Sequence, residues 1–398
     1  MDYTENCLNY NSPSSIKAFL DAHGLSAQKR FGQHFLINEG ARDKLVEALD
    51  VHAGDAVWEI GPGLGAMTRL LLDRGARVTV FEIDRGFVGA LHILFAKEIA
   101  EKRLTIVAGD ALKTWPECSA QAGNTPLSLL GNLPYNIAGT LLGDFIEKGR
   151  LFSRAAVTVQ KEVARRITAR SGDKDYSSLA VLFALAYETR NICPMKGSFF
   201  YPPPNVDSAA LCFYPKSPLK DSHSRGEVAA TFVADPSLLP AACAYGHTLP
   251  PSAGQNHAVH DFVGVPKASM DGRITEYAPD GNPKQDVEGC RPAPRNAPLP
   301  NHSGGEHPHQ NKADVPPIFF PLVRALFARR RKTVYNNLCC FAAENAGFGL
   351  PGESRAALCE TVLSRCGIAK NARAENLSAN DFRSVAECLT DYEHKGQC

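Results

Sequence analysis

The residues Asn132-Leu133-Pro134-Tyr135 carry the most distinctive chemistry of this sequence. They follow the apolar run 127–130, which predicts a buried strand that Pro134 cannot continue. An amide oxygen, backbone carbonyls and an aromatic ring at a strand end can hold a flat base that carries an exocyclic amine. An ordinary strand-to-helix loop explains these four residues equally well. The surrounding segments must therefore decide between a base-binding site and such a loop.

A glycine-rich turn farther upstream points to a nucleotide-like ligand. The run 56–60 reads as a buried strand, the turn 61–65 contains three glycines, an apolar helical pattern follows, and 77–82 reads as a second strand. This order predicts a βαβ unit in a parallel sheet. Backbone N–H groups of the turn can approach a ligand, and Glu82, about 20 residues beyond Gly61, can accept both hydroxyls of a ribose. We therefore expect an adenosine-bearing cofactor.

The spacing of the turn favours S-adenosylmethionine over a dinucleotide. The pattern Glu59-x-Gly61-x-Gly63-x-Gly65 differs from the Gly-x-Gly-x-x-Gly spacing that binds a pyrophosphate. A ligand that carries an ammonium and a sulfonium and no phosphates would tolerate a carboxylate at Glu59. A dinucleotide oxidoreductase is the alternative, which failure to bind NAD in a thermal-shift assay would exclude.

Polar side chains end three successive predicted strands. Glu82, Asp110 and Asn132 all fall at the carboxyl edge of the sheet, where open α/β folds bind ligands. Asp110 could instead only cap the helix that follows it. The segment 29–36 combines bases, aromatic residues and a glycine, and it is either a lid over a ligand or a surface loop.

Basic residues gather at two places, although the net charge of the 398-residue chain is only +1. Lys161 and Arg165 open a predicted helix, where they either contact phosphates or form a solvated face. A second group, Arg329-Arg330-Arg331-Lys332, follows an apolar helical stripe that begins at 318. Four consecutive basic residues without an acidic residue favour a nucleic-acid-binding face.

Composition divides the chain into four parts. Residues 215–317 hold 16 of the 27 prolines without a helical or strand period, so we expect a disordered insertion there and no metal site at its histidines. We expect an N-terminal extension with a short helix over 1–27, an α/β domain over 28–214 and a small helical domain over 318–398. No signal peptide or run of about 18 apolar residues is present, so we expect a soluble, cytoplasmic protein without a membrane partner.

The combined motifs resemble the ribosomal RNA adenine N6-dimethyltransferase family, and specifically its bacterial small-subunit branch. Departures are His34, where Asn is common, and the proline-rich insertion. The resemblance implies a Rossmann-like S-adenosylmethionine-dependent methyltransferase sheet and an all-helical C-terminal domain that binds rRNA. It is carried by residues 31–36, 59–65, 82, 110, 132–135, 160–164, 200–208, 327–338 and 373–378.

The resemblance also implies an activity and a partner. The enzyme would dimethylate two adjacent adenosines in the 3′-terminal hairpin of 16S rRNA, within an assembling 30S subunit, and we expect it to act as a monomer. Alternatives are a resistance-type methyltransferase of 23S rRNA and a non-catalytic ribosome-assembly factor. A test of isolated small and large subunits as methyl acceptors would separate the 16S rRNA activity from the 23S rRNA activity.

Site residues follow from the resemblance position by position. The target adenine would lie against Asn132, Pro134 and Tyr135, with Phe200 as a second aromatic wall. The Asn132 side-chain oxygen and the Leu133 or Pro134 carbonyl would accept the two N6 hydrogens. The implied cofactor contacts are His34, Leu36, Gly61, Glu82, Asp110 and Asn132.

Overall fold

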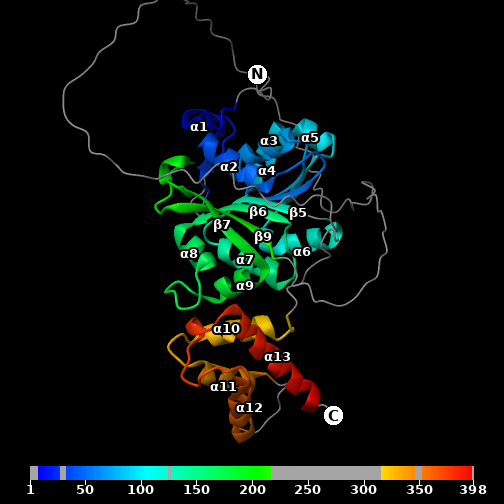
Figure 1. Cartoon of the computed structure of the whole chain (residues 1–398). Helices are drawn as coiled ribbons and strands as arrows, with labels where there is room; N and C mark the ends of the chain where they lie inside the picture. The colour runs from blue at the N-terminus through cyan, green and yellow to red at the C-terminus, as the bar shows by residue number, and fades with distance from the viewer. Residues whose placement is uncertain are drawn as a thin grey trace, which may run out of the picture. The chain divides into compact units, whose positions relative to one another are not determined.

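The computed structural model describes residues 8–26, 33–123, 125, 127–216, 315–345 and 352–396 (Figure 1). The predicted lid residues 29–32 and nearly all of the predicted insertion 215–317 lie outside the described residues. The described elements are α1 (Pro13–Ala22), β1 (Phe35–Leu36), α2 (Glu39–Leu49), β2 (Ala56–Ile60), α3 (Ala66–Asp73), β3 (Arg77–Glu82), α4 (Arg85–Leu94), α5 (Ala96–Ala100), β4 (Leu104–Ala108), α6 (Ala111–Ala122), β5 (Leu127–Asn132), α7 (Ala138–Glu147), β6 (Arg154–Gln160), α8 (Lys161–Thr168), α9 (Ser178–Ala186), β7 (Tyr187–Met195), β8 (Phe200–Tyr201), β9 (Ser208–Pro215), α10 (Phe319–Ala328), α11 (Val334–Glu344), α12 (Gly352–Arg365) and α13 (Ala379–Gly396).

A seven-stranded sheet in the order β4-β3-β2-β5-β6-β9-β7 organises residues 56–215. The strands from β4 to β6 are parallel, and β9 runs antiparallel to both β6 and β7. The chain runs outward from β2 to β3 and β4, and then returns to β5 on the other side of β2. This reversal creates a crevice at the carboxyl ends of β2 and β5, where such folds bind ligands. The predicted Rossmann-like sheet is confirmed.

Alternate residues of the central strands enter two separate cores, as a parallel sheet covered on both faces requires. Trp58 and Leu129 pack with apolar residues of α6, α7 and α9, whereas Val57 and Leu130 pack with those of α2 and α3. The helices therefore cover both faces of the sheet (Figure 1). These two layers fix where the strand ends lie.

Local backbone geometry sets two element boundaries. Helix α2 ends at Leu49 because Asp50 adopts a left-handed conformation with φ 51°. The strand expected to end in Asp110 stops at Ala108. Gly109 has φ 137°, and Asp110 caps α6 through its side chain. The long strand β7 was not predicted, because it shows no regular alternation of buried and exposed residues.

Four α-helices and a short 3-10 helix (Ala374–Asn376) form the described C-terminal part, and α9 contacts both α10 and α13. Tyr176 packs edge-on against Phe327, with ring centroids 5.8 Å apart, and the Gly172 N–H donates to the Glu375 carbonyl at 2.7 Å. No helix among the described residues is long and apolar enough to cross a membrane. Nor do these residues contain a group of three or more His, Cys, Asp or Glu side chains that could hold a metal ion.

Candidate active site

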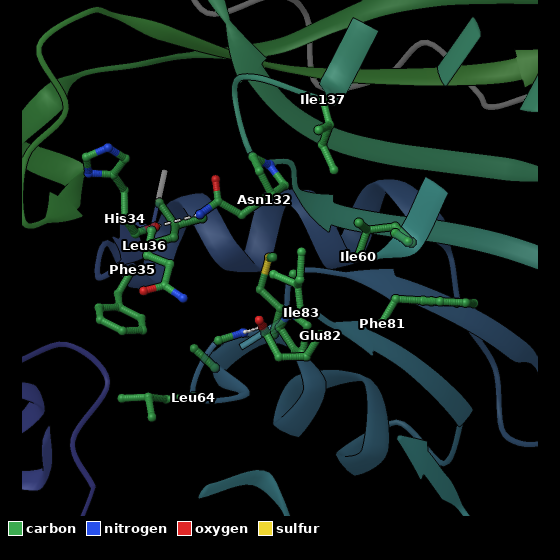
Figure 2. A pocket seen from close by; sticks show the side chains of 18 of the residues that line it. His34, Phe35, Leu36, Ile60, Leu64, Phe81, Glu82, Ile83, Asn132 and Ile137 are labelled. Carbon is green, nitrogen blue, oxygen red and sulfur yellow. Dashed lines mark hydrogen bonds between the residues drawn. The ribbon is translucent and has the colours of Figure 1, made fainter. Parts of the chain in front are cut away.

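A cavity of about 290 Å³ lies at the carboxyl ends of the central strands (Figure 2). The polar strand ends Glu82 and Asn132 line it together with Asp110, so the sheet brings the three predicted side chains to one place. Pro134 also reaches the wall. All six predicted cofactor contacts line the cavity: His34, Leu36, Gly61, Glu82, Asp110 and Asn132.

Glu82 lines this cavity and is held by two backbone N–H groups. Its Oε1 accepts a hydrogen bond from the Asp84 N–H at 2.9 Å, and its Oε2 accepts one from the Gly63 N–H at 3.2 Å. The residue is only 4% exposed, and burial raises the pKa of its carboxyl to about 7. A buried carboxylate with spare lone pairs gains strongly from further donors such as hydroxyl groups.

The glycine turn 61–65 lines the cavity, and two of its three glycines leave no room for a side chain. Gly63 has φ 59°, and a Cβ there would lie 3.1 Å from the Phe35 ring. Gly65 has φ 82°, and a Cβ there would meet the Phe95 ring at 2.3 Å. These positions therefore require glycine. Within the turn, the Gly61 and Gly65 N–H groups donate to the Phe81 and Pro62 carbonyls, and the Gly63 N–H donates to Glu82 Oε2.

Asp110 fulfils the structural role that was considered for it and retains capacity for another. Its Oδ1 accepts from the Leu112 N–H at 3.1 Å, which caps α6. Within the described residues its Oδ2 makes no hydrogen bond, and the residue lines the cavity. Capping and ligand binding are therefore compatible here.

Glu59 does not line the cavity, although its charge guided the choice of cofactor. It lies fully buried in β2, where Oε2 accepts from Thr68 Oγ1 at 2.6 Å and Oε1 has no hydrogen-bond partner among the residues that the structure describes. Burial raises the pKa of this carboxyl to about 7. The carboxylate thus lies beneath the turn rather than against a ligand.

Asn132 is oriented by the backbone of a distant segment. Its Nδ2 donates to the His34 carbonyl at 2.7 Å (Figure 2). Because a carbonyl can only accept, the nitrogen must face His34 and the Oδ1 atom is left to accept another hydrogen bond. The next two strand residues of that segment pair with β8, which anchors it.

Tyr135 is not among the residues that line the cavity, and two contacts fix its side chain. Its hydroxyl shares a hydrogen bond with Ser208 Oγ at 2.7 Å, and its ring stacks on the His34 ring with centroids 5.6 Å apart. His34 Nδ1 in turn lies 2.7 Å from the Pro202 carbonyl, so Nδ1 carries the hydrogen of that bond. Three segments thus converge on one aromatic pair.

The sequence left open whether the Leu133 or the Pro134 carbonyl accepts the second N6 hydrogen, and the two carbonyls differ in their hydrogen bonds. The Pro134 carbonyl already accepts from the Ile137 and Ala138 N–H groups, both at 3.1 Å, as α7 begins. Within the described part of the chain, the Leu133 carbonyl accepts no hydrogen bond. The Leu133 carbonyl thus has more capacity for a further donor than the Pro134 carbonyl, whereas Pro134 is the one of the two residues that lines the cavity. The choice between them stays a prediction.

Phe200 lies away from the cavity in this structure. Its side chain is 2% exposed, because β8 pairs with β1 and turns the ring into the core beside Leu36. Its role as an aromatic wall stays a prediction. Pocket residues that sequence reasoning missed include Tyr10, Ile16 and Ile83; only Ile83, which directly follows Glu82, carried a usable signal.

The predicted RNA-binding residues are exposed but differ in their contacts. Lys161 lies at the start of α8, and Arg165 forms an ion pair with Asp175 at 3.3 Å. Arg330 donates to the Tyr176 carbonyl at 2.6 Å and so links the C-terminal helices to the loop before α9. Arg329, Arg331 and Lys332 are exposed around it.

Comparison with known proteins agrees with this geometry. Residues 24–224 match the family model described as "Ribosomal RNA adenine dimethylase". The "Ribosomal RNA small subunit methyltransferase A" of Treponema denticola is 45% identical over 208 residues, which cover 52% of this chain and 70% of that protein. The protein of the same name from Myxococcus xanthus is 35% identical over 240 residues, covering 56% and 82%.

A solved structure shares the fold. A dimethyladenosine transferase from Plasmodium falciparum superposes with a TM-score of 0.52 at 22% identity, covering 90% of this chain and 97% of that one. The matched family region contains the glycine turn and the polar ends of the central strands. The chain belongs to the ribosomal RNA adenine dimethylase family of methyltransferases.

Proposed function

We propose that this protein uses S-adenosylmethionine to dimethylate N6 of two adjacent adenosines in the 3′-terminal hairpin of 16S rRNA, in an assembling 30S subunit. The observation that carries the proposal is the Asn132 amide, whose nitrogen is held by the His34 carbonyl at 2.7 Å. Its acceptor oxygen remains available at a cavity that Glu82 and Asp110 also line. The names of the bacterial relatives support the small-subunit acceptor over 23S rRNA.

The cavity residues fit S-adenosylmethionine. Glu82 offers a buried carboxylate for ribose hydroxyls, Asp110 offers Oδ2 to an adenine amine, and the glycine turn 61–65 permits close approach of the backbone. Apolar Ile83 and Ile137 suit the faces of an adenine ring. When bound, this cofactor supplies an electrophilic methyl group on a sulfonium.

The chain then has to orient a poorly nucleophilic amine. The N6 lone pair of adenine is delocalised into the ring, so hydrogen bonds from N6 to Asn132 Oδ1 and to the Leu133 or Pro134 carbonyl would both fix its direction and favour a tetrahedral nitrogen. Such pre-organisation lowers the barrier without a general base. Tyr135, held by Ser208 and His34, would stack on the extruded base. Such stacking stabilises binding of the base by about 1–3 kcal/mol.

Mass spectrometry of 16S rRNA tests the proposal. Undermethylated small subunits are incubated with the full chain and S-adenosylmethionine, and the 3′-terminal fragment is analysed. Two N6,N6-dimethyladenosines at adjacent positions are expected. Methylation of isolated large subunits instead, or of neither subunit, would overturn it.

A further inference from the structure

The N-terminal segment 8–22 forms part of the cavity wall, although neither its composition nor the family match accounts for this. Tyr10 and Ile16 both line the cavity. The family model begins at residue 24, so both residues precede the matched region. They are the first side chains of the described chain to reach the site.

Tyr10 is attached to the glycine turn itself. Its hydroxyl donates to the Leu64 carbonyl at 3.0 Å, and Leu64 lies between Gly63 and Gly65. Burial raises the pKa of the Tyr10 hydroxyl, so the group stays a donor throughout the physiological range. The bond therefore ties the N-terminal segment to the loop whose backbone shapes the cavity.

Two further contacts fix the segment to other walls of the cavity. The Asn11 side chain accepts from Arg42, whose other terminal nitrogen donates to the Leu36 carbonyl at 2.8 Å. On α1, Ile16 is 1% exposed and packs with Leu64 and Phe87. Burial of this kind makes the segment a built wall rather than a loose arm.

We infer that the segment around Tyr10 is a binding determinant for S-adenosylmethionine. The segment encloses the cofactor and holds the glycine turn of the protein in place. The inference rests on the proposed function, because it takes the cavity to be the cofactor site. Enclosure removes water and strengthens the polar contacts inside a cavity. The segment should therefore govern cofactor affinity, and it should leave the rate at saturating cofactor nearly unchanged.

Isothermal titration of S-adenosylhomocysteine into the full chain measures this directly. Tyr10→Phe removes only the hydroxyl and should raise Kd about 2- to 10-fold, the usual range for one hydrogen bond. Tyr10→Ala also opens the wall and should raise Kd more than about tenfold. Tyr392→Phe, at an exposed tyrosine of α13, is the matched control. In methylation assays the Tyr10 variants should raise KM for S-adenosylmethionine and keep kcat.

The outcomes separate this inference from the function beneath it. Failure of the wild-type chain to bind S-adenosylhomocysteine would overturn the proposed cofactor and the inference together. Wild-type binding with unchanged Kd in both Tyr10 variants would overturn the inference alone. Thermal unfolding of each variant shows that the protein is folded, and Tyr10→Phe keeps the test decisive even if Tyr10→Ala does not fold.

Discussion

The amide nitrogen of Asn132 lies 2.7 Å from the backbone carbonyl of His34, 98 residues earlier in the chain. This contact decides which atom of the amide remains for a substrate. Because the partner is a backbone atom, the contact does not depend on the side chain at position 34. A histidine at position 34 is thus compatible with this orientation of Asn132.

Replacing Asn132 should stop methyl transfer and weaken cofactor binding far less. In Asn132→Ala the N6 hydrogens lose an oriented acceptor, and kcat should fall about 100- to 1,000-fold, as for other pre-organised polar groups. Incorporation of labelled methyl into small subunits measures the loss, and titration of S-adenosylhomocysteine should show Kd within a fewfold of wild type. Asn191→Ala, at an exposed position of β7, is the control. Methylation at the normal rate would remove Asn132 from the mechanism.

Cofactor affinity should weaken as the pH falls through neutrality. Burial raises the pKa of Glu82 to about 7, so its carboxyl is protonated in more of the free protein at pH 6 than at pH 8. Only the carboxylate can accept two hydroxyl donors, and Kd for S-adenosylhomocysteine should therefore be about tenfold higher at pH 6. Glu82→Gln should bind weakly at both pH values. An equal pH dependence in this variant would assign the titration to another group.

Neutralising Glu59 should stabilise the unliganded protein at high pH. Its folded-state pKa of about 7 exceeds the ordinary value of 4.5, so the folded protein binds more protons than the unfolded chain between these values, and stability falls as pH rises. Glu59→Gln should raise the free energy of unfolding by about 1–3 kcal/mol at pH 8, with a smaller gain at pH 5. Thermal unfolding at both pH values measures this.

A complementary variant tests the same carboxyl group. Thr68→Val removes the hydrogen bond to Glu59 Oε2 and should destabilise the protein most at pH 8, where the carboxylate needs that donor. If Glu59→Gln instead lowers Tm equally at both pH values, the carboxylate has a stabilising partner and the reasoning is wrong.

Substitutions of neighbouring basic residues in the segment 329–332 should have different effects. Arg330 donates to the Tyr176 carbonyl, so Arg330→Ala should lower Tm. Within the described residues the side chains of Arg331 and Lys332 make no hydrogen bond or ion pair. Alanine at either position should leave Tm unchanged and weaken rRNA binding. The slope of log K against log salt should fall by about one for each phosphate that the variant no longer neutralises.

Binding of a 16S rRNA fragment over a range of KCl concentrations checks this difference. Arg331→Ala and Lys332→Ala are matched to Arg330→Ala by position and exposure. Unchanged affinity and salt dependence in both would show that the C-terminal helices present another face to the RNA.

Local sequence determined the elements and the polar residues that end the strands. The bounds of β2, β3 and β5 follow from apolar runs, and the glycines of 61–65 mark the turn, because these patterns depend on neighbours in the chain. Glu82, Asp110 and Asn132 could be placed at one edge, because parallel strands share a direction.

Tertiary structure decided the contacts between residues far apart in sequence. Pairing of β1 with β8 brings His34 to Asn132, and the folding back of α1 brings Tyr10 to Leu64. The start of α7 occupies the Pro134 carbonyl, and the Leu133 carbonyl keeps more capacity for a further donor. None of these follows from local propensity, because each depends on where the chain returns to the sheet. The sequence by itself thus determined which residues could do chemistry, and the tertiary structure decided which of their atoms remain available for it.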